Sequence, residues 1–208
     1  FIRTSFENSA RVVTPADVAR VRKETAEQKK PYTFDEVWRS VPHEYPLSKD
    51  WKVSASHTGE GRKGSTITPG SAYTFEGWTT GVTQKAGMWF QTELPEAVTL
   101  AEVHFRSPPI SRGWREGSPP PIPTYPRGFD FEISMDGKQW KKLISNGEGK
   151  GNFTLLRFEP VQTKFIRMTL TRSEDVVHGD RRGKPFDFEV VWNMREVKLF
   201  VLEGRDYD

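Results

Sequence analysis

The chain has 208 residues, and its 31 Lys and Arg against 28 Asp and Glu give a formal net charge of +3. This length predicts one domain with at most an appendage, and the small net charge lacks the basic excess typical of nucleic-acid binders. The 12% aromatic content excludes a disordered chain, the 17 Gly and 15 Pro exclude a long-helix protein, and the lack of Cys excludes a disulfide scaffold, a thiolate zinc site and covalent haem attachment.

Residues 1–47 predict a helical extension that ends in a linker. Thr14 can cap a helix and Pro15 suits its first position, so a helix is expected over residues 14–30. The capping box Thr33-Phe34-Asp35-Glu36 predicts a second, shorter helix before a Pro-containing linker. The start has neither Met nor the layout of a signal peptide, so we expect the chain to be a piece of a longer protein. No apolar run approaches the roughly 18 residues of a membrane span.

From residue 48 onward the apolar residues recur with a period of two. Phe129, Phe131 and Ile133 alternate with polar residues, and Asp136-Gly137 then predicts a tight hairpin turn. Short strands with turn signals between them predict a mainly β domain, an antiparallel sandwich or barrel over residues 48–208. The eight expected strands cover residues 52–57, 88–94, 98–106, 129–135, 140–144, 153–158, 165–170 and 195–201.

Two long loops interrupt these strands, and loops of this length are often functional. Residues 107–127 are rich in Pro and Gly, and residues 173–189 are polar. No enzyme motif accompanies them, since the four His residues lack metal-ligand spacing and no Gly-x-Ser-x-Gly or phosphate-binding loop occurs. We therefore expect no catalytic residues in this chain.

The order of short motifs after residue 51 resembles the discoidin domain, also called the coagulation factor five/eight type C domain, a family that includes galactose-binding-like carbohydrate-binding modules. The resemblance implies an eight-stranded antiparallel jelly-roll β-sandwich that binds ligands with loops at one end and carries out no catalysis. The matching motifs are Val53-Ser54-Ala55-Ser56, Trp78-Thr79-Thr80-Gly81, Gly87-Met88-Trp89-Phe90-Gln91-Thr92-Glu93-Leu94, Ser134-Met135-Asp136-Gly137-Lys138-Gln139-Trp140, Phe165-Ile166-Arg167-Met168 and Trp192-Asn193-Met194-Arg195-Glu196-Val197-Lys198-Leu199-Phe200.

A second resemblance lies at the N-terminus. The stretch Phe1-Ile2-Arg3-Thr4-Ser5-Phe6-Glu7-Asn8, followed by Val13-Thr14-Pro15, is similar to the tail of a class I c-type cytochrome domain, from which Thr4 and Glu7 depart. In that family the haem-attaching motif would lie upstream, so no haem is expected here. The resemblance implies a bacterial, extracytoplasmic, multidomain parent, itself an oxidoreductase candidate, whose neighbouring domains are partners of this one.

Sugar binding in the discoidin fold comes from loop aromatics together with His and Arg side chains, because aromatic rings stack on the apolar face of a pyranose while Arg and His donate to hydroxyls. Two structural alternatives stay open: Trp114 folds its own loop onto the sandwich, and each His is a solvated or backbone-bonded loop residue. Trp78, Trp89 and Trp140 are expected in the core. The candidate ligand-binding residues are Trp114, Tyr125, Arg112 and Arg115 on the long loop, His57, Arg62 and Tyr73 on the early loops, and His178 and Arg181 on the late loop.

The discoidin resemblance also implies a candidate structural calcium site with a Glu on the last strand, which Glu196 matches. The earlier loop lacks the family's Asp-Gly and offers only Glu76. The alternative is that Glu196 pairs with an Arg or caps a loop.

We therefore expect a non-catalytic module that binds a carbohydrate or another cell-surface polymer. Two alternatives stay open: a structural or protein-docking domain without a sugar site, and a jelly-roll hydrolase with two facing carboxylates. Four loop arginines also form a candidate site for acidic glycans or phospholipid headgroups, or else an ordinary solvated face. They are Arg106, Arg112, Arg115 and Arg127.

Overall fold

A computed structural model describes residues 19–20, 22–23, 41–60, 67–110, 121–180 and 185–202. The chain divides into two compact units, residues 1–41 and 42–208. In the first unit Ala19, Arg20, Arg22 and Lys23 are helical and exposed, and the rest of the two predicted helices lies outside the described residues. Within the described part of the chain, no helix is long and apolar enough to cross a membrane.

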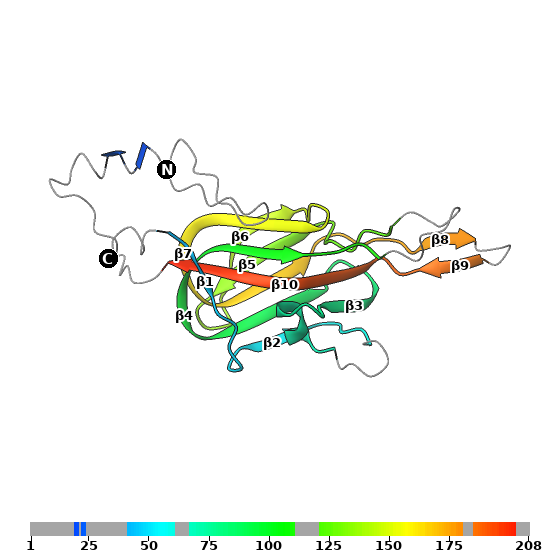
Figure 1. Ribbon diagram of the computed structural model, residues 1–208, viewed down its shortest axis with the longest axis horizontal. Helices are drawn as coiled ribbons and strands as arrows, with labels where there is room; N and C mark the ends of the chain where they lie inside the picture. The colour runs from blue at the N-terminus through cyan, green and yellow to red at the C-terminus, as the bar shows by residue number, and fades with distance from the viewer. Residues whose placement is uncertain are drawn as a thin grey trace. The chain divides into compact units, whose positions relative to one another are not determined.

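The regular elements of the second unit are ten strands and one short 3-10 helix among the described residues (Figure 1). The prediction of a mainly β domain is confirmed. The elements are β1 (His43–Tyr45), β2 (Lys52–Ala55), the 3-10 helix η1 (Pro69–Tyr73), β3 (Trp78–Thr83), β4 (Trp89–Arg106), β5 (Phe129–Ser134), β6 (Lys141–Gly147), β7 (Phe153–Leu170), β8 (Val177–Asp180), β9 (Pro185–Phe188) and β10 (Val191–Leu202).

The long strands β4 and β7 each contribute to both layers of the sandwich. Residues 89–93 of β4 pair with β2 and with the end of β7, whereas residues 98–106 pair with β10 and with the start of β7. Strands β5 and β6 extend the first layer, and β1 and β3 pair with β10 in the second. All of these pairings are antiparallel, and they join eight strands, which confirms the predicted eight-stranded jelly-roll sandwich.

Four of the predicted strands are in fact the halves of β4 and β7. The prediction of separate strands on either side of residues 95–97 and 159–164 was wrong, because these segments, with Pro95 and Pro160, lie within continuous strands. Both prolines are exposed and lie where the pairing register of β4 and β7 shifts, so their missing N–H groups cost no regular ladder bond. The two strands bend there from one layer into the other.

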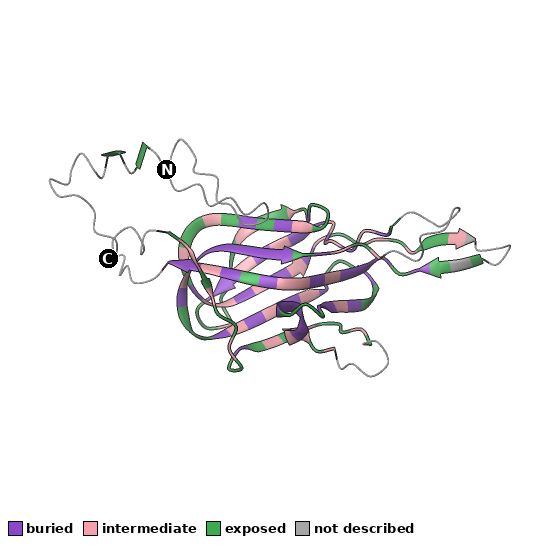
Figure 2. Cartoon of the chain, in the orientation of Figure 1, coloured by how far each residue is buried: buried purple, intermediate pink, exposed green. Residues whose placement is uncertain are grey.

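The core lies between the layers, and buried residues alternate with exposed ones along much of each strand (Figure 2). At its centre Trp78 and Trp192 are almost fully buried and meet edge to face with ring centroids 5.1 Å apart. Phe90 lies 5.1 Å from Trp78 and 6.5 Å from Trp192. Aromatic pairs of this geometry add about 0.5–1.5 kcal/mol each beyond the area they bury.

Of the tryptophans predicted to be core residues, Trp78 is buried, but Trp89 and Trp140 are only half-buried. Trp140 lies at a strand edge, and the guanidinium of Arg167 stacks over its ring at 3.7 Å.

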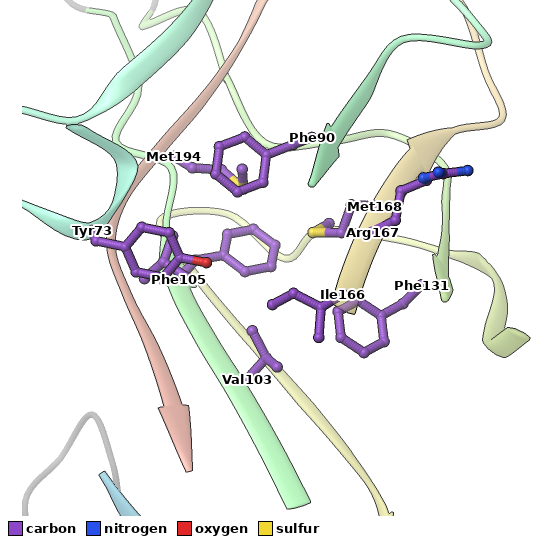
Figure 3. Close-up of a pocket in the computed structure, with 10 residues that line it drawn as sticks. Tyr73, Phe90, Val103, Phe105, Phe131, Ile166, Arg167, Met168 and Met194 are labelled. Atoms are coloured by element: carbon purple, nitrogen blue, oxygen red, sulfur yellow. The ribbon is translucent and has the colours of Figure 1, made fainter. Parts of the chain in front are cut away.

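Arg167 also lines a small cavity between the layers, from which its guanidinium points away (Figure 3). That cavity measures about 10 Å³, at the lower limit of the roughly 10–15 Å³ that one bound water needs, so it is a packing space and not a ligand site.

Four of the described strands lie where no strand was predicted, one of them β3, which contains the Trp78-Thr79-Thr80-Gly81 motif. Strand β1 falls in the predicted linker, and the β8–β9 hairpin falls in the predicted loop 173–189. This hairpin extends beyond the sandwich (Figure 1). The pairing of Val177 with Phe188 begins a ladder that runs to Asp180 and Pro185. Its polar, half-exposed sequence lacks the alternation that identifies a buried strand.

Candidate functional site

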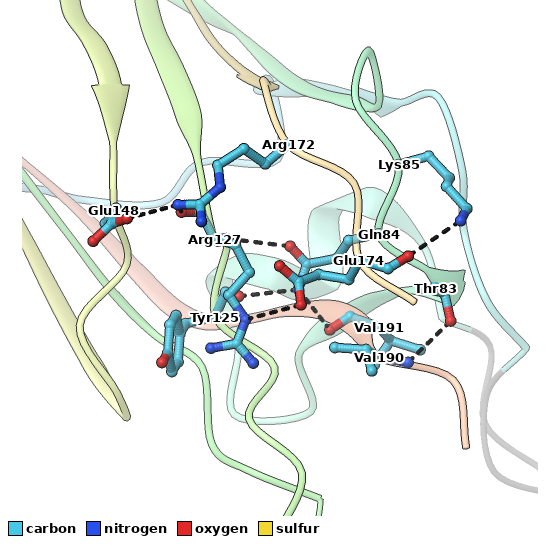
Figure 4. Close-up of polar contacts among 10 residues, drawn as sticks. All are labelled: Thr83, Gln84, Lys85, Tyr125, Arg127, Glu148, Arg172, Glu174, Val190 and Val191. Atoms are coloured by element: carbon cyan, nitrogen blue, oxygen red, sulfur yellow. Dashed lines mark hydrogen bonds and ion pairs between the residues drawn. The ribbon is translucent and has the colours of Figure 1, made fainter. Parts of the chain in front are cut away.

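One end of the sandwich is formed by the segments that follow β3 and β7, the segment that precedes β5 and the start of β10 (Figure 4). We call it the loop end, and it comprises residues 83–88, 121–128, 171–176 and 189–191. At its centre the side chain of Gln84 is fully buried. The amide nitrogen Nε2 of Gln84 donates to the backbone oxygen of Tyr125 at 3.0 Å and to that of Val191 at 3.2 Å. One buried side chain therefore links three segments that are far apart in sequence.

The backbone of Gln84 adds two further links. Its N–H donates to the backbone oxygen of Val190 at 3.0 Å, and its backbone oxygen accepts from the N–H of Glu174 at 2.9 Å. The Oε1 atom lies 3.4 Å from the backbone nitrogen of Arg127, which donates to it. Backbone N–H and C=O groups in loops otherwise need water as their hydrogen-bond partner. Here the atoms of Gln84 are their partners, and this network holds the loop end in one conformation.

Thr83 fixes the late loop against the end of β3. Its backbone N–H donates to Glu189 Oε2 at 2.6 Å, its hydroxyl also donates to that carboxylate, and the same hydroxyl accepts from the backbone N–H of Val190 at 3.1 Å. Below this contact Phe188 and Val190 pack with Ile122 of the long loop in a small apolar cluster.

The base of the long loop is closed in a similar way. Ile110 and Ile122 exchange two backbone hydrogen bonds of 2.9 Å. The Thr124 hydroxyl donates to the backbone oxygen of Pro108 at 2.9 Å, and the Ser107 hydroxyl donates to that of Asn193 at 2.7 Å. The described ends of the loop are therefore held on the sandwich by pairing and by buried hydroxyls.

Tyr125 and Arg127 form the chemically distinctive pair of the loop end. The Arg127 guanidinium lies 4.1 Å from the centre of the Tyr125 ring. Its Nε is 3.8 Å from a carboxylate oxygen of Glu174, which is an ion pair but too long for a hydrogen bond. Among the described residues this Nε–H has no hydrogen-bond acceptor. Glu174 and Tyr125 thus hold Arg127 in place with its Nε atom buried, so the guanidinium could meet a ligand only through its Nη atoms.

Other charges surround this pair and are more fully used. Arg172 donates to the Glu148 carboxylate at 2.7 Å and to the backbone oxygen of Arg127 at 3.2 Å. Lys85 donates to the backbone oxygen of Glu174 at 3.1 Å. These contacts orient the backbone around Arg127 (Figure 4), so the surface combines an aromatic ring with a guanidinium on a braced backbone.

The structure places the predicted ligand-binding residues in several different positions. Tyr125 lies at the loop end, whereas the exposed His57 ring contacts the neighbouring Ser56 hydroxyl at 3.0 Å. His178 of β8 contacts the Asp187 carboxylate of β9 at 2.6 Å, both side chains being exposed. Four predicted site residues on the loops, together with Arg62, lie outside the described residues. These four are Trp114, Arg112, Arg115 and Arg181.

Tyr73 lies away from the loop end, in η1, and is 9% exposed. Its hydroxyl is 2.6 Å from that of Thr92, and burial raises the pKa of Tyr73 despite this hydrogen bond. Its ring packs edge to face against Trp51 at 5.0 Å. Tyr73 therefore acts first as a core residue.

Glu196, the candidate calcium ligand, is bound by an arginine. Its carboxylate accepts from Arg106 Nη1 at 2.8 Å, and its backbone N–H donates to the backbone oxygen of Thr74 at 3.1 Å. The described residues contain no group of three His, Asp or Glu side chains that could hold a metal ion. A guanidinium at this distance repels a divalent cation, so the residues present do not fit a calcium ion, and calcium stays an untested prediction.

The residues that organise the loop end were missed by sequence reasoning. Gln84 occupies a short turn without a pattern, and its importance comes from three carbonyl and amide partners that only the fold brings together. Glu174 belongs to a loop that was singled out for its length and polarity. Arg127 was included only in the candidate basic cluster.

The chain is similar in fold to solved carbohydrate-binding modules. One of them is chitosan-binding module 1 from a chitosanase/glucanase of Paenibacillus sp. IK-5, solved as a selenomethionine-labelled mutant. The alignment covers 99% of that module and 76% of this chain, with 16% identity and a TM-score of 0.50. The chain also covers 99% of CBM32-1 from a family 31 glycoside hydrolase of Clostridium perfringens, with 79% of this chain aligned, 16% identity and a TM-score of 0.49. At this identity the likeness shows the fold alone.

No curated protein matches the sequence. The family model of the F5/8 type C domain matches residues 52–179, more than half of the chain. This match includes β2 to β7 and most of the loop end. It confirms the discoidin resemblance, whereas the resemblance to a cytochrome tail stays a prediction. The chain therefore belongs to the F5/8 type C, or discoidin, family of non-catalytic binding domains.

Proposed function

We propose that this domain is a non-catalytic carbohydrate-binding module that binds a polysaccharide through its loop end. The observation that carries the proposal is the pair of Tyr125 and Arg127, a ring and a guanidinium on a backbone braced by Gln84. Aromatic rings bind the apolar face of a sugar, and the Nη atoms of a guanidinium donate to its hydroxyl or carboxylate groups.

The fold likeness supports the same class of ligand. The similar module from the Paenibacillus chitosanase/glucanase is described as chitosan-binding. We extend the proposal to the parent protein, which we place outside the cytoplasm as a bacterial multidomain protein in which this domain holds a polymer near its neighbours.

Native affinity electrophoresis tests the proposal. The chain is run in gels that contain neutral, amino or acidic polysaccharides, with bovine serum albumin as the unretarded reference. We expect at least one polysaccharide to retard the chain, and retardation to weaken in Tyr125→Ala and Arg127→Ala. Lys52→Ala is the matched control, because Lys52 is an exposed cation on β2 whose partner is Glu93. A chain that no polysaccharide retards would contradict the proposal.

A further inference from the structure

A second pocket lies beside β1, η1 and β10. Its volume is about 230 Å³, and its walls include Tyr45, Trp51, Phe75 and Lys198. It is separate from the loop end, because Lys198 follows Val191 by seven residues along β10, roughly 23 Å at about 3.3 Å per residue. We call it the β1 pocket.

The apolar wall of the β1 pocket is a rigid stack of rings. Tyr45 stacks on Trp51 with centroids 5.6 Å apart and an interplanar angle of 19°, and Trp51 meets Tyr73 edge to face. Trp51 and Tyr73 are buried, so this wall is fixed by the core. At the rim, by contrast, Phe75 is 73% exposed and Leu47 is 52% exposed. Exposed apolar side chains beside a preformed wall mark a binding surface.

The polar part of the β1 pocket is electrically balanced. Lys198 donates to the Glu44 carboxylate at 2.8 Å, and both side chains are about half exposed. The other carboxylate, that of Glu196, is matched by Arg106. These paired charges favour an uncharged ligand whose hydroxyl groups can both donate to a carboxylate and accept from an ammonium.

We propose that the β1 pocket binds one pyranose ring of a neutral glycan, as a second contact for the polymer held at the loop end. The inference rests on the proposed function. The pocket has the volume of seven or eight water molecules at about 30 Å³ each, which is below the range of about 300–1,000 Å³ typical of larger ligands. One sugar ring fits this volume, with its apolar face on Phe75 and its hydroxyls at Glu44 and Lys198. Two contacts on one domain would raise its avidity for a polymer.

Amide and indole NMR of the ¹⁵N-labelled chain tests the inference. The probes are methyl β-glucoside, methyl β-galactoside and methyl N-acetyl-β-glucosaminide, each titrated alone. The reporters for the β1 pocket are the indole N–H of Trp51 and the amides of Phe75 and Lys198, and those for the loop end are the amides of Gln84 and Glu174. We expect at least one glycoside to shift the reporters of the β1 pocket to saturation.

Variants separate binding from nonspecific shifts. Phe75→Ala is expected to weaken binding at the β1 pocket about fivefold by removing the exposed ring. The matched control, Met135→Ala, removes another large apolar side chain, 51% exposed and next to the β5–β6 turn, and should leave the affinity unchanged. Shifts at the loop end alone would overturn this inference and leave the proposed function standing, whereas shifts at neither place would overturn the inference and count against the proposed function. An equal affinity in Phe75→Ala would also overturn the inference.

Discussion

The buried amide of Gln84 donates to the backbone oxygen of Tyr125, and the ring of Tyr125 lies 4.1 Å from the guanidinium of Arg127. A residue at the end of β3 therefore positions an aromatic side chain and its cation on a different segment. This relationship makes the loop end a preformed surface, since the same amide is also tied to β10 through Val191.

Replacing Gln84 by Ala should destabilise the domain. The change leaves the backbone oxygens of Tyr125 and Val191 without their donor, and an unsatisfied buried group costs about 1–3 kcal/mol. The free energy of unfolding in urea measures the loss. Gln162→Ala is the control, because Gln162 is exposed on β7, and it should stay within about 0.5 kcal/mol of the parent. Equal stabilities of the two variants would contradict the bracing role of Gln84.

Gly77 and Gly87 should differ in their tolerance of a methyl group. Both have positive φ, 80° and 88°, so Ala at either position costs about 1–2 kcal/mol of backbone strain. A Cβ at Gly77 would also come within 2.4 Å of the Arg195 side chain, whereas at Gly87 no atom lies within 4 Å. Gly77→Ala should therefore have the lower melting temperature. The reverse order would show that the side chain of Arg195 does not pack against this turn.

Calcium should leave the stability of the domain unchanged. The Arg106 guanidinium already supplies the positive charge at the Glu196 carboxylate. Neither calcium chloride nor a chelator should therefore move the melting temperature by more than about 1 °C. For a domain of this size, 1 kcal/mol of stability corresponds to about 2–4 °C. A rise of several degrees on adding calcium to the unmodified chain would instead support the metal site expected from the family.

Acid should weaken the domain partly through Glu102. Burial by itself raises the pKa of the Glu102 carboxyl. The hydrogen bond from His104 and the charge of Arg157 lower this pKa by a larger amount, so the pKa lies below the ordinary value of 4.5. A carboxyl with a lowered folded-state pKa stabilises the protein above its unfolded-state pKa, and this stabilisation is lost as the pH falls through the folded-state value.

Urea unfolding of the parent and of Glu102→Gln between pH 3 and pH 7 measures this effect. The stability difference between the two should be largest near pH 7 and should shrink below about pH 4.5. Glu132→Gln is the control, because Glu132 is a half-buried carboxylate on β5. A difference that does not change with pH would contradict the electrostatic role of the Glu102 cluster.

The alternation of apolar residues was enough to predict the sandwich, since residues such as Phe129, Phe131 and Ile133 can be buried only if their strand has one face in a core. It could not predict that β4 and β7 are continuous. Pro95 and Pro160 interrupt the pattern, and only the pairing partners show that the chain bends there without ending a strand.

The candidate site was predicted less completely. Tyr125 was found because the discoidin resemblance implies that loop aromatics bind sugar, whereas Gln84 carries no local signal and depends on partners 41 and 107 residues away. Tyr73 was chosen as a loop aromatic, but its ring packs against Trp51 in the core. Single residues in loops take their roles from contacts that the order of residues does not reveal.

The most direct test of the central claim is the dissociation constant, by isothermal titration calorimetry, of the polysaccharide that retards the chain most. Our account predicts that Tyr125→Ala and Arg127→Ala each weaken binding about tenfold or more, corresponding to about 1.4 kcal/mol, while Lys52→Ala binds like the parent. Unchanged binding in both loop-end variants would contradict the account and place the sugar elsewhere on the domain.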